Sequence, residues 1–202
     1  METYYSEEEL KGLGLKKCGA NVKLSRHAVI YKPEELEIGS NVRIDDFTTI
    51  SGKVTLGSYI HIAQTCGLYG ADAGIVMENF TTISSHSLVY AVSNDYSGFS
   101  LACPMVPEQY RPADITAPVR LKKYALVGCM SVILPGVTIG EGCSIGAMSL
   151  CNKDLEPWGM YVGIPARRIK DRSKQLLALA RQFEQEQCDK ECAITNYDSF
   201  SG

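Results

Sequence analysis

Three histidines are the first candidates for chemistry in this chain of 202 residues. His27, His61 and His86 are its only histidines. A neutral imidazole titrates near neutral pH, so a positioned histidine can take a proton from a reacting group. Any histidine that acts as a base must be one of these three, and their positions in the fold decide which of them can do so.

Metal chemistry is not expected. The eight cysteines include no CxxC pair, which structural zinc sites commonly use. Cys66, Cys129, Cys143 and Cys151 fall at or near the inward positions of the repeat described below, where cysteine acts as a small apolar side chain. These four are predicted to be structural.

Composition excludes several classes of partner. The net charge is -3, the pI is about 5.7 and no block of Lys or Arg occurs, so nucleic acid and anionic membranes are not expected partners. The start METYYSEEELKGLGL is acidic and lacks the apolar run of a secretion signal, and no stretch approaches the roughly 20 apolar residues of a membrane span. A reduced, cytoplasmic setting is predicted.

A period of six residues positions these side chains. Between Val119 and Leu150, apolar residues recur every sixth position, at Leu121, Val127, Ile133, Ile139 and Ile145. Ala125, Ser131, Val137 and Cys143, two positions earlier, are small or β-branched, and Gly128, Gly140 and Gly146 directly follow periodic residues, where a tight corner tolerates glycine. Helices repeat at 3.6 residues and strands at 2, so a period of six predicts a parallel β-helix.

The same period runs through the first half of the chain. It begins at Leu24 and Ile30 and, after the insertion YKPEE, resumes at Ile38, Ile44, Ile50, Leu56, Ile62 and Leu68. A second insertion, 70–74, is followed by Met77, Ile83 and Val89. On this phase His61 points out of the coil, His86 lies at an outward corner, and His27 is assigned to structure or surface.

The pattern also sets the expected boundaries. Residues 1–20 are predicted to form a helical cap with a capping box between Ser6 and Glu9, and residues 21–171 the β-helix domain. Residues 92–118 hold four prolines and no period, and their apolar side chains predict a protruding arm that packs on a neighbouring subunit. Residues 172–190 are predicted as a C-terminal helix covering the coil's end, and 191–202 as a flexible tail.

The run VGCMSVILPGVTIGEGCSIGAMSL, the closing YVGIPARRIK and the proline-rich loop before them resemble the hexapeptide-repeat acyltransferases over roughly residues 20–172. The motif NDYSG resembles the sugar O-acetyltransferases of polysaccharide biosynthesis, such as galactoside O-acetyltransferase. The resemblance implies an all-β, left-handed parallel β-helix, a homotrimer with active sites between subunits, and acetyl-CoA as co-substrate.

The resemblance also implies site residues. His86 and His61 remain alternative bases, with a surface histidine as the structural alternative for His86. Antibiotic-acetylating relatives have an Asn-His pair that aligns, by position in the coil, with Asn94 and Asp95. The chain has Asp where that pattern has His, so it departs from the pattern. Asp95 is predicted to orient a histidine or bind the sugar, with a turn role as its alternative. Tyr96 and Tyr110 are predicted to stack on a sugar ring.

The donor is expected along the later coils. The small residues Gly128, Gly146 and Ala147 allow a rod-shaped carrier to approach the backbone. Positive charge for its nucleotide end is expected from Lys153, Arg167, Arg168 and Lys170, whose structural alternative is a solvated face.

The predicted function is an acetyl-CoA-dependent O-acetyltransferase acting on a sugar or glycan precursor of a surface polysaccharide. The alternatives are N-acetylation of a nucleotide-linked amino sugar, and a non-enzymatic β-helical binding scaffold. A γ-class carbonic anhydrase, a β-helical zinc enzyme, is not expected because it needs two histidines close in sequence.

Overall fold

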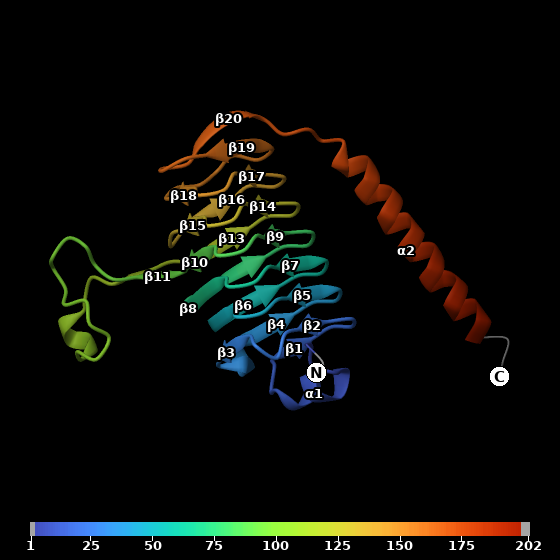
Figure 1. The fold of residues 1–202 in the computed structure, drawn as a ribbon, viewed down its shortest axis with the longest axis horizontal. Coiled ribbons are helices and arrows are strands. Elements are labelled where there is room, and N and C mark those ends of the chain that lie inside the picture. The colour runs from blue at the N-terminus through green and yellow to red at the C-terminus, as the bar shows by residue number, and fades with distance from the viewer. Residues whose placement is uncertain (1–2, 199–202) are drawn as a thin grey trace. The chain divides into compact units, whose positions relative to one another are not determined.

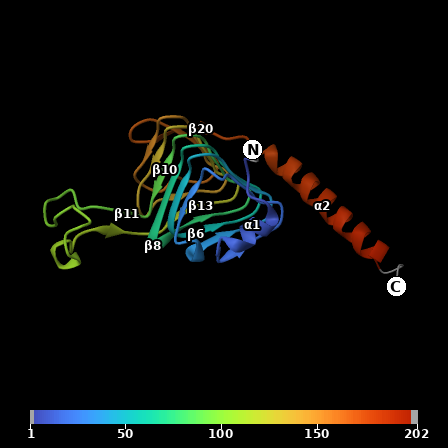
Figure 2. The same cartoon turned by 60° about the horizontal axis from the view of Figure 1, so that its bottom comes forward.

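The computed structural model describes residues 3–198, with side chains for residues 3–189. The residues up to Asp171 form one unit and those from Arg172 onward a second, and each is described by itself. The first unit is a parallel β-helix of short strands (Figures 1 and 2). The period of six therefore predicted the architecture correctly.

Two sheets build three faces of the coil. Face 1 is one sheet, in the order β2 (Lys23–Leu24), β5 (Val42–Ile44), β7 (Ile60–Ile62), β9 (Thr82–Ile83), β14 (Leu126–Val127), β17 (Ser144–Ile145), β19 (Gly159–Val162) and β20 (Arg167–Asp171). Its strands pair in parallel except β20, which is antiparallel to β19.

The second sheet covers faces 2 and 3. Face 2 holds β3 (Val29–Tyr31), β10 (Leu88–Tyr90), β15 (Val132–Ile133) and β18 (Leu150–Cys151). Face 3 holds β1 (Lys17–Cys18), β4 (Leu36–Ile38), β13 (Val119–Leu121) and β16 (Thr138–Ile139), and the 3-10 turn η1 (Pro33–Glu35) precedes β4. The long strands β6 (Thr49–Leu56) and β8 (Gly67–Met77) belong to both faces, because each pairs with face 2 strands first and face 3 strands later. The insertion at residues 70–74 lies between the two halves of β8, since residues 67–69 pair with β10 and residues 75–77 pair with β13.

The interior is filled by the periodic residues. Leu121, Val127, Ile133 and Ile139 are fully buried, and so are the earlier Ile38, Ile44, Ile50 and Ile62. Burial of one such side chain contributes about 1.5–3 kcal/mol. Ile30 is the exception, since it is only partly buried beside the open first coil.

The glycines after periodic residues serve close approach. A Cβ on Gly128 would lie 2.6 Å from the amide nitrogen of Ala147, and one on Gly140 would lie 2.6 Å from the carbonyl oxygen of Leu155. Neither glycine has a positive φ. The prediction of a tight corner was therefore wrong about the cause, because the next coil, and not backbone freedom, excludes a side chain there.

Cysteine placement was predicted in three cases out of four. Cys66, Cys143 and Cys151 are buried, and burial raises the pKa of the Cys151 thiol to about 12, which makes it unreactive. Cys129 is exposed, contrary to the prediction, because it lies at the outward corner, two residues after the buried Val127 and two before the buried Ser131.

The first helix is the predicted one. α1 (Glu7–Gly12) has Ser6 as its N-cap, and the capping box forms through Ser6 N to Glu9 Oε2 at 2.8 Å and Glu9 N to Ser6 Oγ at 3.3 Å. Leu10 is buried against the first coil.

The second unit contains α2 (Leu176–Asp198), so the helix extends beyond the predicted boundary at residue 190. Its role as an end cap stays a prediction. Residues 199–202 of the predicted tail lie outside the described residues.

The arm, residues 92–118, leaves the coil between β10 and β13 (Figure 1). Its base is a two-stranded antiparallel ladder of β11 (Val92–Ser93) and β12 (Ile115–Thr116), and its tip holds the 3-10 turn η2 (Glu108–Tyr110). The arm exposes Phe99, Leu101 and Met105 to solvent. Such apolar exposure fits the predicted packing on another subunit, which stays a prediction.

Candidate active site

One edge of the coil, here the serine corner, joins face 1 to face 2. It comprises residues 45–48, 63–66, 84–87, 128–131 and 146–149 in successive turns. Backbone bonds fix their register: Ser84 N donates to Val127 O at 2.9 Å and Gly128 N to Ile145 O at 2.8 Å. Ser84, Gly128 and Gly146 therefore lie in one column.

Two further columns run beside it. Met130 N donates to Ser85 O at 3.0 Å and Met148 N to Cys129 O at 2.8 Å. These bonds place Ser85, Cys129 and Ala147 in a second column, and His86, Met130 and Met148 in a third. The structure thus brings the predicted base His86 and the predicted donor residues Gly128, Gly146 and Ala147 to one edge. Their proximity could not be read from the sequence, because the arm lies between His86 and the three donor residues along the chain.

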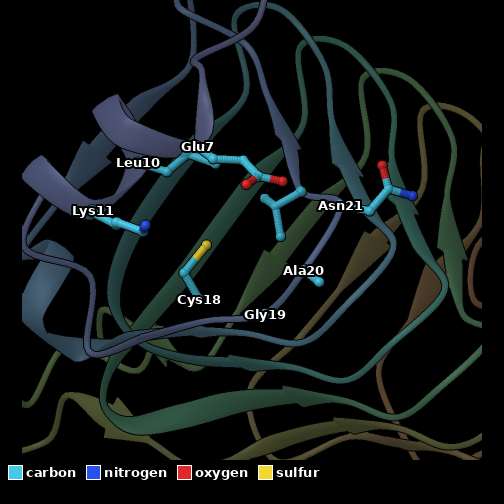
Figure 3. A pocket seen from close by; sticks show the side chains of 8 residues that line it. Glu7, Leu10, Lys11, Cys18, Gly19, Ala20 and Asn21 are labelled. Atoms are coloured by element: carbon cyan, nitrogen blue, oxygen red, sulfur yellow. The ribbon is translucent and has the colours of Figure 1, made fainter. Parts of the chain in front are cut away.

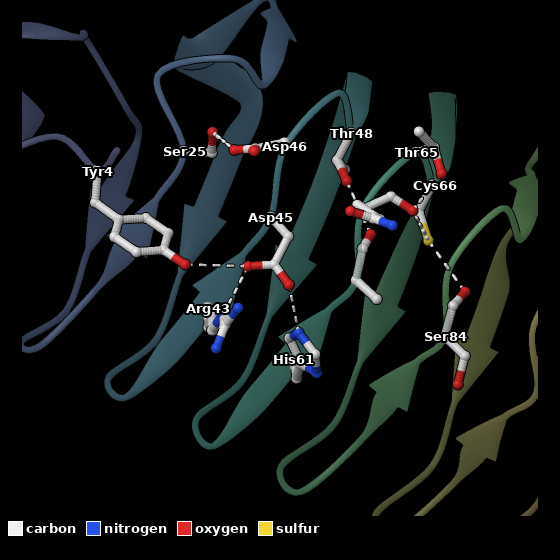
Figure 4. Close-up of polar contacts among 12 residues, drawn as sticks. Tyr4, Ser25, Arg43, Asp45, Asp46, Thr48, His61, Thr65, Cys66 and Ser84 are labelled. Atoms are coloured by element: carbon white, nitrogen blue, oxygen red, sulfur yellow. Dashed lines mark hydrogen bonds and ion pairs between the residues drawn. The ribbon is translucent and has the colours of Figure 1, made fainter. Parts of the chain in front are cut away.

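Inward hydroxyl groups hold the corner rigid. Ser87 Oγ donates to Gly128 O at 3.0 Å and Ser131 Oγ to Gly146 O at 3.2 Å, and both serines are fully buried. One coil earlier, Cys66 Sγ donates to Ser84 O at 3.2 Å (Figure 4). Because the inward groups are satisfied, the corner presents a fixed outer surface.

Sequence reasoning missed a column of free amides. Among the described residues, the backbone N–H groups of Ser85, Cys129 and Ala147 have no hydrogen-bond partner. Cys129 and Ala147 are exposed and Ser85 is half-buried. Fixed, unpaired N–H groups beside small side chains can bind carbonyl oxygens or a developing oxyanion. The signal in the sequence was the small residue at each of these corner positions.

His86 lies at the corner, outward as predicted, with φ 62°. Its Nδ1 is 2.8 Å from Thr65 Oγ1, and that hydroxyl donates its only proton to Gln64 O at 2.6 Å. Thr65 Oγ1 must therefore accept, so in the neutral ring Nδ1 carries the hydrogen and Nε2 is left as a proton acceptor.

His61 also points out of the coil as predicted, and it contacts Asp45, in the first turn of the serine corner, and not Thr65 or His86. Its Nε2 is 2.8 Å from Asp45 Oδ2, while Arg43 Nε donates to Asp45 Oδ1 at 2.6 Å and Tyr4 OH donates to the same oxygen at 3.3 Å (Figure 4). Partial burial raises the pKa of Asp45, but the bonds from Arg43 and His61 outweigh it and keep that pKa below its usual value.

His27 is exposed and its ring is 5.7 Å from that of Phe47, in agreement with a surface or structural assignment.

Asp95 lies at the beginning of the arm, and its carboxylate accepts four hydrogen bonds. Oδ1 accepts from Ser97 Oγ at 2.5 Å and Ser97 N at 2.8 Å, and Oδ2 from Phe99 N at 2.7 Å and Ser100 N at 3.0 Å. These bonds, the Ser97 hydroxyl first, lower the pKa of Asp95 to about 2. The turn role is therefore observed, and any catalytic role adds to it.

A single copy does not bring Asp95 to the serine corner. Face 2 separates them, because β10 (Leu88–Tyr90) crosses that face between the His86 corner and the arm, at about 3.3 Å per residue. Tyr96 and Tyr110 lie on the same arm and are 93% and 53% exposed. A site that uses both regions needs a second copy.

The predicted cations divide between two edges. Arg167 pairs with Val162, whose side chain fills the space over Gly146, so Arg167 ends the glycine column. Lys170 is exposed on the same strand. Arg168 donates to Asp171 Oδ1 at 2.7 Å and Tyr161 OH at 3.3 Å, which engages its guanidinium. Lys153 follows β18 and lies on the edge between faces 2 and 3, away from the serine corner.

A hollow at the N-terminal end lies elsewhere. It is lined by α1 residues Glu7, Leu10 and Lys11 and by Cys18–Val22 (Figure 3). It contains no histidine and no part of the serine corner. Among the described residues no group of three or more His, Cys, Asp or Glu side chains is arranged to hold a metal ion. No helix in the described part of the chain has the length and hydropathy for a membrane crossing.

Known proteins identify the family, although no family model matches the chain. The dTDP-4-amino-4,6-dideoxy-D-glucose acyltransferase of Escherichia coli is 38% identical over 184 residues, which cover 90% of this chain and 95% of that protein. The chain belongs to the hexapeptide-repeat acyltransferases. The resemblance seen in the sequence, the left-handed β-helix and the acyltransferase class are thereby confirmed.

A solved relative is more similar still. AntD, an N-acyltransferase from Bacillus cereus in complex with dTDP and 3-hydroxybutyryl-CoA, is 46% identical with a TM-score of 0.90, covering 93% of this chain and 99% of AntD. A maltose O-acetyltransferase from Clostridium difficile 630 is 20% identical with a TM-score of 0.56, which shows a shared fold alone. The more similar proteins are therefore those named for amino-sugar chemistry.

Variants of AntD with one serine or one aspartate substituted have also been solved, with coenzyme A and either dTDP or dTDP-4-amino-4,6-dideoxyglucose. In AntD the aspartate follows the serine by the same number of residues as Asp95 follows Ser85 in this chain.

Proposed function

We propose that this acyltransferase moves an acyl group from an acyl-coenzyme A to the amino group of a nucleotide-linked amino sugar. The observation that carries the proposal is the whole-length similarity to the Escherichia coli enzyme named for a dTDP-linked amino sugar and to AntD, an N-acyltransferase. It favours the N-acetylation alternative from the sequence over O-acetylation of a glycan precursor, and it disfavours the scaffold.

The donor lies along the serine corner. The unpaired amides of Cys129 and Ala147 face carbonyl oxygens of the pantetheine arm, and these two exposed, small residues leave the backbone beside them accessible. Arg167, at the end of the column, meets the nucleotide phosphates. The thioester then lies beside Ser85.

The binding site for the acceptor is completed by a second copy of the chain. The arm of one subunit brings Asp95, with Tyr96 and Tyr110, to the serine corner of the next, because one copy alone keeps the two regions apart. This arrangement places each site between subunits of a symmetric oligomer, for which we propose the trimer expected from the resemblance.

The reaction forms one bond and breaks another. The neutral amine attacks the thioester carbonyl carbon and forms the C–N bond, and the carbonyl oxygen takes negative charge beside the Ser85 N–H. The nitrogen, now a positively charged ammonium, gives one proton to Asp95. Collapse breaks the C–S bond and releases the thiolate of coenzyme A, which takes up a proton.

The low pKa of Asp95 suits an amine better than a hydroxyl. A neutral amine is already a nucleophile, and it becomes a strong acid only after attack, so a carboxylate with a pKa of about 2 suffices to accept its proton. A sugar hydroxyl must lose its proton during the attack and needs a stronger base. The exposed Ser97 hydroxyl can rotate away from Oδ1 and leave that site for the ammonium.

One observation favours a second candidate. His86 offers a free Nε2 at the corner beside Ser85, as a base for a hydroxyl acceptor requires. O-acetylation of a sugar with His86 as base is therefore the competing function.

The test is an acceptor comparison with purified protein. Acetyl-CoA and 3-hydroxybutyryl-CoA are each offered with dTDP-4-amino-4,6-dideoxyglucose, with the matched dTDP-sugar bearing a hydroxyl at carbon 4, and with simple galactosides. Thiol release and product mass are measured. Acylation of the amino sugar alone supports the proposal, whereas turnover confined to hydroxyl acceptors overturns it.

A further inference from the structure

Three basic side chains form a line on the outer surface of face 1, here the basic strip. Lys23 on β2 is the register partner of Arg43 on β5, and Arg43 is the partner of His61 on β7. Neighbouring strands lie about 4.8 Å apart, so the line is about 10 Å long. The next register partner is Thr82 on β9, the strand that leads directly into Ser84 and Ser85.

Asp45 fixes the orientation of two members of the strip. Its carboxylate is mostly buried, at 15% exposure, while the Arg43 and His61 side chains bonded to it are 55% and 40% exposed. Figure 4 shows both side chains turned toward the carboxylate. Orientation before binding lowers the entropy cost of gripping a ligand.

The strip still carries free donors and net positive charge. Asp45 takes the Nε–H of Arg43, and the Tyr4 ring lies on one side of the guanidinium with its centroid 6.0 Å from Cζ. The side chain of Arg43 is still 55% exposed, so its outward N–H groups can reach a ligand. Lys23 is exposed. With Asp45 counted, Lys23 and Arg43 leave a surplus of one positive charge even while His61 is neutral.

We propose that the basic strip binds the diphosphate of a nucleotide-linked acceptor, with Arg43 as the central ligand and His61 and Lys23 on either side. Donors spaced along a line match two linked phosphates better than one carboxylate, and a guanidinium binds phosphate oxygens in pairs. This rests on the proposed function, which supplies the nucleotide-linked sugar.

Placement relative to the donor supports the proposal. The free amides and glycines that face acyl-coenzyme A run from Ser85 toward the C-terminal coils, and the strip runs from Thr82 toward the N-terminal coils. A ligand on the strip therefore reaches the reacting thioester from the opposite side to the donor. His61, one of the two bases predicted from the sequence, receives a binding role.

The experiment measures binding of dTDP, thymidine and coenzyme A by calorimetry. The variants are Arg43→Gln, His61→Gln and Lys23→Gln, and the matched control is Arg120→Gln, an exposed outward arginine on face 3. Loss of one charge-assisted contact should weaken dTDP binding by about ten- to a hundredfold in Arg43→Gln and less in the other two. Coenzyme A binding and the control should stay unchanged, and thymidine binding should be equal in all proteins.

Two results separate this proposal from the proposed function. If the wild type acylates the amino sugar but Arg43→Gln and His61→Gln bind dTDP as tightly as it does, the basic strip is not the diphosphate site. If the wild type acylates no nucleotide-linked amino sugar, the proposed function fails, while selective loss of dTDP binding in these variants still supports the strip. Arg43 and His61 are both bonded to Asp45, so their variants could fail to fold. In that case Lys23→Gln, at an exposed side chain, replaces them in the dTDP-binding measurement.

Discussion

Two edges of the same coil turn through the same backbone conformation, a residue with positive φ, but they carry different kinds of side chain. The serine corner turns at Thr65, His86 and Met130, all with positive φ. The edge joining face 3 to face 1, here the aromatic corner, turns in the same way at Tyr59, Phe80, Tyr124 and Trp158. The same backbone turn therefore supplies both edges, and contacts between aromatic rings distinguish one of them.

The aromatic corner is closed by its own rings. Tyr59 and Phe80 stack with centroids 4.9 Å apart, Phe80 and Tyr124 with centroids 5.5 Å apart, and Trp158 lies 6.4 Å from Tyr124. At the serine corner the residues before the turning positions are the small Ser85, Cys129 and Ala147, whose amides have no partner among the described residues. Met130 and Met148 are exposed there. The aromatic corner is therefore filled by its own side chains, whereas the serine corner has the open backbone that the proposed donor site requires.

The largest expected effect concerns Asp95. Asp95→Asn removes the proton acceptor, so kcat should fall about 10²- to 10⁴-fold. Its amide oxygen keeps one pair of the turn bonds and its amide nitrogen cannot accept the other, so Tm should fall slightly. Steady-state kinetics with the amino-sugar acceptor and thermal melting check this. Ser97→Ala is the control, since it retains the carboxylate and should keep kcat within a few-fold. Full turnover in Asp95→Asn would remove Asp95 from the chemistry.

Blocking the open edge should give the next largest effect. Ala147 is exposed, so Ala147→Trp should fold normally but fill the donor column and raise KM for acyl-coenzyme A about tenfold or more. Glu141→Trp places the same side chain at an exposed position of the aromatic corner and should leave KM unchanged. Equal KM values for the two variants would contradict the assignment of the donor to the serine corner.

A substitution in the aromatic corner should lower the stability of the fold and leave substrate binding unchanged. Trp158→Ala removes a half-buried ring that packs over Gly142 and beside Tyr124, so the free energy of unfolding should fall by about 1–2 kcal/mol with KM for both substrates unchanged. Met148→Ala, at an exposed side chain of the serine corner, should change stability by less than about 0.5 kcal/mol. Denaturant unfolding of both variants measures the difference, and a reversed order would refute the division of roles.

The smallest expected effect is that Ser97→Ala has the same pH dependence of kcat/KM as the wild type. A lowered pKa of about 2 means that Asp95 is ionised at every pH above that value and is protonated only as the pH falls through it. Any loss of kcat/KM between pH 8 and pH 5 must then come from another group, such as the acceptor amine, and should persist in Ser97→Ala. An acid limb that disappears in His86→Gln would assign the base to His86.

The sequence predicted the repeat because burial enforces it. Each of Val127, Ile133 and Ile139 must point inward, so the period appears directly in the residue order. The capping box at Ser6 and Glu9 was predicted for the same local reason. The role of Gly128 was misread, because the contact that excludes its side chain comes from a coil 18 residues later.

The site was predicted only in part. His86 and Gly146 were predicted individually as site residues, and those roles stay predictions. That they share one edge depends on coil stacking across the arm. The pairing of His61 with Asp45 and the Thr65 bond to His86 join residues 16 and 21 positions apart, and no local pattern marks such contacts. The free amides of Ser85 and Cys129 leave no trace in residue types beyond small size.

The central claim is that each active site joins the arm of one copy to the serine corner of another. Asp95→Asn and Ala147→Trp subunits, each inactive at low acyl-coenzyme A, are co-expressed with different tags, and the mixed oligomers are purified and assayed. Each mixed trimer contains one site in three that combines an intact arm with an intact corner, so the purified mixed oligomers should show about a third of wild-type activity. Mixed oligomers as inactive as their parents would contradict the claim and place both halves of the site within one chain.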